Sequence, residues 1–407
     1  MQITAKKGVK LFRDFYIDMD IKPYFTPKTL NLPIGFKNDN IKYLKQSGDL
    51  VEKFEIIAMV NGDIPVYSTA SGRIVEFFFN ALSEQFSPII FANIETDGSD
   101  KPTYPLWDIK RYYSKDEFLN IIKKAGIVNE VSQGYFVNFI NHVTKYQKLV
   151  IDCVDDQPYD LSKTAVMLNF TKEVINGAEI LAKAFNIPKI ELLVMKNFRT
   201  SEFIKNGLEN IEIVTVKGKY PSELQIVQYV HKNTALRVGV QCIRAIYRAM
   251  FFGEPQIKNV VTIWGEGVEK PAICEVLTGT PIKFLLQSRA AKGVLERVVS
   301  GGIMSGYVTS PELSMLRFDS ALTAMPPKKH SKACECVNCG RCTVVCPMHL
   351  APYFILRSSK QKNEQIAKQL TAGMCIYCGA CSYICPSRQP LVQKIREYNI
   401  ELSRGDV

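Results

Sequence analysis

The sequence has no run of uncharged apolar residues as long as the roughly 18–20 that a membrane-spanning helix needs. It also lacks an apolar signal core after its first residues, MQITAKK, and it lacks a block of consecutive basic residues. The first two absences predict a cytoplasmic protein without an integral membrane segment, with peripheral association to a membrane complex left open. The third argues against nucleic acid as a partner, because the lysines and arginines behind the net charge of +11 are spread along the chain. Such a charge is typical of a solvated basic surface or of a protein that docks an acidic partner.

The chain has 407 residues, more than the roughly 250–300 at which a single core stops growing, so several domains are expected. Short apolar runs between glycine-bearing turns predict strands at 55–60 and 72–79 in a small barrel or sandwich. Further along, apolar runs alternate with helical spacing, which predicts a parallel sheet in an α/β domain. Its expected strands are 148–152, 190–195 and 211–216, and its expected helices are 116–124 and 162–185.

Eight of the twelve cysteines fall within residues 336–385. They form two copies of C-x2-C-x2-C-x3-C-P, which read CVNCGRCTVVCP at 336–347 and CIYCGACSYICP at 375–386. This spacing is typical of two-cluster bacterial ferredoxins, in which the fourth cysteine of each motif binds the other cluster. Structural zinc also uses four cysteines, but usually as paired C-x2-C elements with variable gaps. The pattern therefore predicts two [4Fe–4S] clusters rather than zinc.

The cross-over of the fourth cysteines fixes the expected ligand sets. Cluster one is predicted to bind Cys336, Cys339, Cys342 and Cys385, and cluster two is predicted to bind Cys375, Cys378, Cys381 and Cys346. Nothing between the motifs has a catalytic pattern, and residues 352–372 are expected to form a solvated helical connector. No catalytic residue is predicted, so the clusters are expected to conduct electrons between partners.

The four remaining cysteines lie outside the motifs. Cys153, Cys242 and Cys274 are isolated, which predicts small buried side chains. Cys334 lies two residues before the first motif and is either a bystander or a redox-active thiol beside the cluster.

Most of the chain, residues 30–395, resembles the RnfC family, the peripheral subunits of Rnf ion-pumping complexes and their soluble relatives, including the PrdC type associated with proline reductase. The resemblance rests on YLKQSGDLV at 43–51, DCVDDQPY at 152–159, GEGVEKP at 265–271, GGIMSG at 301–306 and the two cysteine motifs. It implies a multidomain α/β and α+β fold. The implied order is an N-terminal extension at 1–30, a β barrel-sandwich hybrid at 31–104, a Rossmann-like α/β domain at 105–256, a β-grasp (SLBB) domain at 257–306, a connector at 307–332 and a C-terminal two-cluster ferredoxin-like helical domain at 333–407.

The family resemblance also implies a site for FMN, and in relatives for NADH, in the α/β domain. Three segments of this chain depart from the family pattern. The glycine-rich loop reads NEVSQGYF at 129–136, where Glu130 places a negative charge at the expected phosphate position. The segments VQCIRA at 240–245 and YPSEL at 220–224 lack the family's Asn, Thr and Gly. A degenerate flavin site would retain only Gly134, Asp155 and Asp156, so neither FMN nor NADH is expected to bind as it does in relatives.

The resulting prediction is an iron–sulfur electron-transfer protein that connects a reduced donor with a partner reductase, such as an amino-acid reductase, or with an Rnf-type complex. The alternative is an NADH dehydrogenase component that holds FMN in an atypical pocket and feeds the same clusters.

Overall fold

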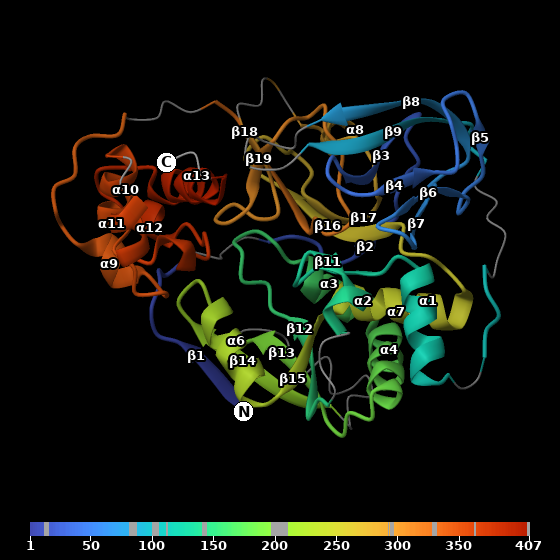
Figure 1. Ribbon diagram of the computed structural model, residues 1–407, viewed down its shortest axis with the longest axis horizontal. Coiled ribbons are helices and arrows are strands. Elements are labelled where there is room, and N and C mark those ends of the chain that lie inside the picture. Colours follow the sequence, from blue (N-terminus) through green and yellow to red (C-terminus); the bar gives the residue numbers. More distant parts are fainter. Residues whose placement is uncertain are drawn as a thin grey trace.

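The computed structural model describes residues 1–11, 16–80, 88–99, 106–110, 113–140, 145–196, 211–291, 293, 297–327, 332–361 and 364–404. Figure 1 shows two β-rich regions side by side, an α/β region beneath them and a separate helical region at the C-terminal end. No helix within the described ranges is long and apolar enough to span a membrane. Lys328, Lys329 and His330 lie outside the described residues.

The first β-rich region consists of a four-stranded and a three-stranded sheet. Alternate side chains of β3 (Thr29–Phe36) are buried, among them Leu30 and Leu32. They pack in a core between the two sheets that also contains Ile57 and Ile74. The strands expected at 55–60 and 72–79 are present. The four-stranded sheet contains β3 (Thr29–Phe36), β9 (Ile89–Thr96), β8 (Gly72–Asn80) and β5 (Leu50–Val51), and the other contains β4 (Ile41–Tyr43), β6 (Ile56–Val60) and β7 (Ile64–Tyr67).

A five-stranded parallel sheet forms the centre of the α/β region. Its three predicted strands are present. Residues 148–153 and 190–195 are buried almost throughout, which fits the centre of a sheet covered on both faces, whereas burial alternates along 212–218. The extension expected at 1–30 is not a separate tail, because residues 2–5 pair with β14 (Glu212–Gly218) and complete the sheet edge. The strand order is β1 (Gln2–Ala5), β14 (Glu212–Gly218), β13 (Ile190–Met195), β12 (Lys148–Cys153) and β15 (Ala235–Gly239).

The single helix expected at 162–185 is two helices. Phe170 leaves helical geometry, with φ −126° and ψ 32°, and its ring packs 3.4 Å from the guanidinium carbon of Arg244. That tertiary contact outweighs the continuous helical pattern. The region contains α1 (Lys115–Lys124), α2 (Phe136–Ile140), α3 (Ser162–Asn169), α4 (Thr171–Ala184), α6 (Glu223–Lys232), α7 (Val240–Phe252) and a short hairpin of β10 (Val128–Asn129) and β11 (Gly134–Tyr135).

A six-stranded mixed sheet packs beside the α/β region. The connector expected from residue 307 begins later than predicted, because β19 and β20 pair with β18, and Leu322 and Ala324 are buried. Residues 21–22 of the expected extension form its other edge. The strand order is β19 (Tyr307–Thr309), β18 (Arg297–Ser300), β20 (Ala321–Met325), β16 (Lys258–Trp264), β17 (Ala272–Leu277) and β2 (Ile21–Lys22), with α8 (Ile282–Ser288) following β17.

The C-terminal region is helical and carries both cysteine motifs. The expected solvated connector at 352–372 is only partly solvated, because Ile355 and Leu356 are buried and α10 packs against α13. Ile395 and Tyr398 of α13 belong to the same small core as Ile355. The elements are α9 (Arg341–Val345), α10 (Pro352–Lys360), α11 (Glu364–Gln369), η1 (Ala372–Met374), α12 (Ala380–Ile384) and α13 (Leu391–Arg404).

Candidate iron–sulfur centre and adjoining cavity

The two cysteine motifs share one local backbone. Each turns at a glycine and continues as a short helix, α9 after Gly340 and α12 after Gly379. Their φ angles, 68° and 77°, lie in the left-handed region that residues with a Cβ rarely adopt. At Gly379 a Cβ would also lie 2.4 Å from the carbonyl oxygen of Met304. The loops that present the cysteines therefore depend on glycine at both positions.

The first three cysteines of the first motif face the last cysteine of the second. Cys336, Cys339, Cys342 and Cys385 line one cavity of about 120 Å³. The backbone N–H of Asn338 donates to Cys336 Sγ at 3.4 Å, a contact of the kind that tunes cluster ligands. The sequence predicts the same four residues for cluster one, and this geometry supports a ligand set that itself remains a prediction.

Cys346, the last cysteine of the first motif, lies with the second motif. The pKa of Cys381 is raised to about 12, mainly because the thiol is buried. The neighbouring thiols of Cys378, Cys375 and Cys346 raise it further. Cys346 and Cys381 are each 8% exposed. Thiolates gathered this far from water need a compensating cationic group. These four thiols therefore fit the environment of an iron–sulfur cube, and they are the predicted ligands of cluster two.

Among the residues that the structure describes, no group of three or more His, Cys, Asp or Glu side chains is arranged to hold a single metal ion. In a cubane cluster each thiolate binds a different iron atom, so the four thiolates surround a larger volume than the ligands of one ion. The choice of iron–sulfur over zinc therefore depends on the cysteine spacing.

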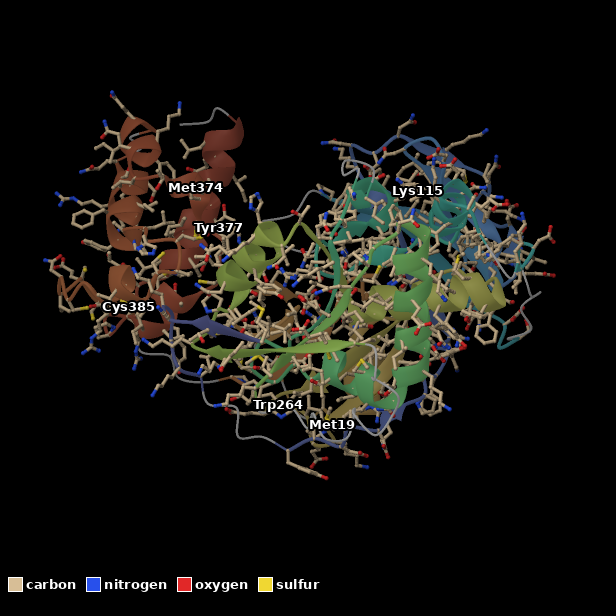
Figure 2. The ribbon with its side chains drawn as sticks, turned by 90° about the horizontal axis from the view of Figure 1, so that it is seen from below. Met19, Lys115, Trp264, Met374, Tyr377 and Cys385 are labelled. Atoms are coloured by element: carbon tan, nitrogen blue, oxygen red, sulfur yellow. The ribbon has the colours of Figure 1, made fainter. Side chains whose placement is uncertain are left out.

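A second cavity, of about 650 Å³, opens at the carboxyl edge of the parallel sheet. Ligand sites of open α/β sheets usually occupy this edge. The cavity reaches the second cysteine motif, and Figure 2 shows Tyr377 on the side of the helical region that faces the rest of the chain, with Cys385 farther out. Its lining includes Asp155, Lys163, Tyr220, Asp319, Tyr377 and Cys378.

Glu130 occupies the helix end beside this cavity. Its carboxylate accepts the backbone N–H groups of Gln241 at 2.8 Å and Cys242 at 3.0 Å, which lie in the first turn of α7. A Cβ on Gly239 would lie 2.0 Å from the carboxyl carbon of Glu130, so glycine there makes room for this side chain. A helix N-terminus with free N–H groups is a common phosphate site. Here an internal carboxylate takes those groups, so the residues present do not fit an FMN phosphate at this position.

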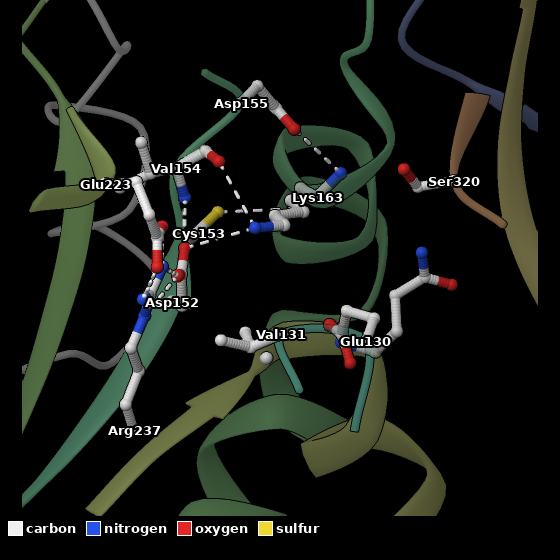
Figure 3. A network of polar contacts seen from close by, with 12 residues as sticks. Glu130, Val131, Asp152, Cys153, Val154, Asp155, Lys163, Glu223, Arg237 and Ser320 are labelled. Atoms are coloured by element: carbon white, nitrogen blue, oxygen red, sulfur yellow. Dashed lines mark hydrogen bonds and ion pairs between the residues drawn. The ribbon is translucent and has the colours of Figure 1, made fainter. Parts of the chain in front are cut away.

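A buried ion-pair network fixes the same edge of the sheet (Figure 3). Asp152 is fully buried and accepts from Arg237 Nε at 2.7 Å, Lys163 Nζ at 3.2 Å and the Val154 N–H at 2.9 Å. Burial alone would raise the pKa of Asp152, but Arg237 and Lys163 lower it well below its usual range. Arg237 also binds Glu223 with two hydrogen bonds, of 2.6 and 2.9 Å. Lys163 and Arg237, which line the cavity, are thus both committed to carboxylates of the chain.

The remaining charges make the cavity acidic. Burial raises the pKa of Asp319 to about 6, although the Leu316 N–H donates to its carboxylate at 2.8 Å. Burial and the neighbouring Asp160 raise the pKa of Asp155 well above its usual range. The carboxyl groups that are ionised repel phosphate groups. The lining contains six acids, Glu130, Asp155, Asp156, Asp160, Glu223 and Asp319, and three bases, Lys163, Arg237 and Arg396.

Tyr220 connects the cavity wall to the second cysteine motif. Its hydroxyl donates to the Cys378 carbonyl at 2.8 Å and accepts from Gln157 Nε2 at 3.0 Å. Gln157 also contacts Ser305 Oγ at 2.7 Å and accepts the Met304 N–H at 3.2 Å. Three parts of the chain that are distant in sequence therefore meet at the side chain of Tyr220, which is 2% exposed.

The structure separates the residues predicted for a degenerate flavin site. Asp155 and Asp156 line the cavity, whereas Gly134 lies in β11 and is not among the lining residues. Asp156 accepts the Ser222 N–H at 2.8 Å and Asp155 accepts the Thr164 N–H at 3.0 Å, so both carboxylates have bonds within the chain. A flavin-binding role for these residues stays a prediction.

Sequence reasoning missed Lys163, Arg237 and Gln157, because isolated polar residues carry no spacing signal. Only the unusual charge of Arg237 inside an otherwise apolar strand could have marked it.

The cysteines outside the motifs were expected to be small buried side chains at positions 153, 242 and 274. Cys153, Cys242 and Cys274 are indeed buried. Cys334 is exposed, and its N–H donates to the Ser387 carbonyl at 3.1 Å.

The 4Fe-4S dicluster domain family matches residues 335–388. The chain is 26% identical over 353 residues to the C subunit of the ion-translocating oxidoreductase complex of Buchnera aphidicola subsp. Baizongia pistaciae, covering 80% of this chain and 69% of that protein. It is 26% identical over 359 residues to the C subunit of the proton-translocating ferredoxin:NAD(+) oxidoreductase complex of Clostridium ljungdahlii, covering 80% and 77%.

Two structures of an NAD+-reducing [NiFe]-hydrogenase, in the air-oxidised and H2-reduced states, align with TM-scores of 0.43 and 0.45 at 11% identity. They cover 72% and 71% of this chain and 55% and 61% of the hydrogenase chains. The two relatives each cover 80% of this chain, and the dicluster family matches the segment that holds the cysteine motifs. The chain is an RnfC-like homologue of the C subunits of ion-translocating oxidoreductases, with a C-terminal dicluster domain for two [4Fe–4S] clusters.

Proposed function

We propose that the chain transfers electrons through its two clusters between a reduced donor and a partner reductase or Rnf-type complex, without a flavin of its own. The observation that carries this proposal is the arrangement of eight cysteines as two sets of four. The described residues of the helical region contain no arrangement of side chains typical of a catalytic site. We therefore assign its function to the two clusters.

The proposed partners are inferred by analogy with the complexes to which the relatives belong. The relative from Clostridium ljungdahlii belongs to a complex named for ferredoxin and NAD(+). By analogy, this chain would be a peripheral, cytoplasmic component of an Rnf-type complex, or a soluble relative that serves an amino-acid reductase. On the same analogy, the β-rich, α/β and six-stranded regions correspond to a barrel-sandwich hybrid, a Rossmann-like domain and a β-grasp (SLBB) domain. These regions would dock the donor and the reductase.

Two features of the cavity support a protein without FMN. The N–H groups at the start of α7 already bind Glu130, and six acids line the cavity against three bases. An FMN or NADH phosphate would have to displace the Glu130 carboxylate from the N-terminus of α7. At a helix N-terminus a carboxylate is stabilised by roughly 0.3–2 kcal/mol through the helix dipole. The phosphate would then enter a cavity whose lining has twice as many acids as bases.

The second candidate is an NADH dehydrogenase with FMN in an atypical pocket. One observation favours it: the cavity of about 650 Å³ reaches Cys378, which would put a bound redox group beside the second cluster. In that case the phosphate must lie away from α7, and Asp155 or Asp156 must exchange its present backbone bonds for contacts with the ligand.

The content of iron, acid-labile sulfide and flavin in anaerobically purified protein decides between the two candidates. The proposal expects about eight iron atoms per chain, four for each cubane cluster, and no stoichiometric flavin. FMN released by acid at close to one per chain would refute it. Bleaching of the visible absorbance by NADH alone, under anaerobic conditions, would establish the dehydrogenase instead.

A further inference from the structure

The two predicted cluster sites differ in their access to solvent. Cluster two has two buried ligands, Cys346 and Cys381, and its loop packs against the rest of the chain through Tyr220 and Met304. At cluster one, Cys339 is exposed and the other three cysteines are half-buried. Electron exchange with another protein requires a short path from a cluster to the surface, so cluster one is the accessible end.

Exposed apolar side chains surround that end. Val337 is 65% exposed and Phe354 is 57% exposed, and both line the cavity of the cluster-one cysteines. Val344 in α9, two residues after Cys342, is 71% exposed. Several large apolar side chains gathered on one surface usually mark an interaction site, whereas single ones do not.

The C-terminal region that carries this surface has a net positive charge. Residues 332–404 contain ten lysines and arginines against four acids, which places +6 of the chain's net +11 in this part of the sequence. Arg341 lies next to Cys342 and is exposed, as are Lys332 and Arg388 before and after the cysteine loops. Glu335 is an exposed acid close to the first cysteine motif. An apolar centre with a basic rim complements an acidic partner that carries an apolar patch.

We propose that the surface formed by Val337, Arg341, Val344 and Phe354, here called the cluster-one face, docks an acidic ferredoxin-type protein. The inference rests on the proposed electron-transfer function and adds where the partner binds and what its charge is. In the reaction, the reduced ferredoxin loses one electron and cluster one gains it, and no bond or proton changes place. Cys378, a predicted ligand of cluster two, lines the large cavity, so a bound second cluster would adjoin it.

The test uses the full-length chain with both clusters and a dithionite-reduced acidic [4Fe–4S] ferredoxin, freed of excess dithionite. Stopped-flow absorbance gives the second-order rate constant of electron transfer at several salt concentrations. Arg341→Glu is expected to lower this constant about tenfold at low salt and to flatten its salt dependence, because a rim charge acts mainly on association. Arg341→Lys retains the charge and is expected to retain most of the rate. Val344→Ser is expected to slow transfer without altering the salt dependence.

Matched controls lie far from the cluster-one face. Lys189→Glu makes the same change of charge beside the amino end of β13, and Val75→Ser makes the same apolar-to-polar change in β8. Both are expected to react at the wild-type rate. Equal rates for Arg341→Glu and Lys189→Glu, with clusters intact by iron content, would overturn the docking inference. Failure of the proposed function is distinguishable, since the clusters would then be absent or would not accept electrons even from dithionite.

Discussion

Replacement of Tyr220 by phenylalanine tests whether the cluster-two loop is held by the cavity wall. The substitution removes one hydroxyl, so the Cys378 carbonyl loses its donor and Gln157 loses one of its partners. Tyr220 is 2% exposed, which makes it difficult for water to replace the hydroxyl. A buried polar group left without its partner costs about 1–3 kcal/mol. We expect the contact between the helical region and the rest of the chain to weaken by this amount.

A loss of about 1–3 kcal/mol corresponds to a roughly 5- to 150-fold increase in the population of the open form. Hydrogen exchange measures that population directly, at the backbone amides of Cys378 through Ile384, under conditions where local opening limits the rate. The reduction potential of cluster two, read from its EPR signal during a redox titration, is a second measurement. It is expected to shift while that of cluster one stays constant, because hydrogen bonding and solvation set cluster potentials.

Tyr398→Phe is the matched control. Its hydroxyl lies 3.4 Å from Ser358 Oγ and is also buried, but both residues belong to the helical region and do not connect it to the cavity. If Tyr220→Phe gives the same exchange rates and the same cluster-two potential as wild type, the hydroxyl does not hold the loop. If both variants accelerate exchange equally, the effect is a general loosening of the helical region.

Three further changes have defined outcomes. Cys346→Ser is expected to reduce the EPR signal of cluster two more than that of cluster one, and equal loss of both would leave the predicted ligand sets without support. Arg237→Met leaves the buried Asp152 charge with Lys163 alone, so the free energy of unfolding of the α/β region should fall by about 3–5 kcal/mol in denaturant titrations. The pKa of Asp319 is raised to about 6 in the folded chain, so the folded state retains its proton longer than the unfolded state and loses stability as pH rises from about 4 through 6. Asp319→Asn should therefore gain stability relative to wild type between pH 5 and pH 8, by about 1–2 kcal/mol, and a difference independent of pH would contradict the raised pKa.

The features that the sequence predicted well are those encoded by nearby residues. Each cysteine motif spans twelve consecutive positions, and the strands at 148–153 and 190–195 are mostly apolar runs. The features that it did not predict depend on contacts between distant parts of the chain. Residues 2–5 carry no strand signal of their own and become a strand by pairing with β14. Phe170 interrupts a good helical pattern because its ring packs on Arg244.

Glu130 shows the same limit at the candidate site. Its charge was visible in the sequence as a misfit with a phosphate loop, but its partner could not be inferred. The backbone groups that it binds lie more than 100 positions along the chain, and they are amides, which no residue type reveals. The sequence indicated that a phosphate was disfavoured, and the structure adds a physical cause.

The hydrogen bonds between Glu130 and the start of α7 also explain how the α/β region can be stable without a bound ligand. The start of a long helix leaves N–H groups that need an acceptor, and a bound phosphate can supply one. In this chain Glu130 supplies the acceptor from within, and Asp152 and Glu223 neutralise the cations at the same edge. The α/β region can therefore be complete with its cavity free of nucleotide. The cysteines of cluster two are in the opposite situation, since burial and the neighbouring thiols raise the pKa of Cys381. The folding of the helical region should thus depend on iron and sulfide, whereas that of the α/β region should not depend on flavin.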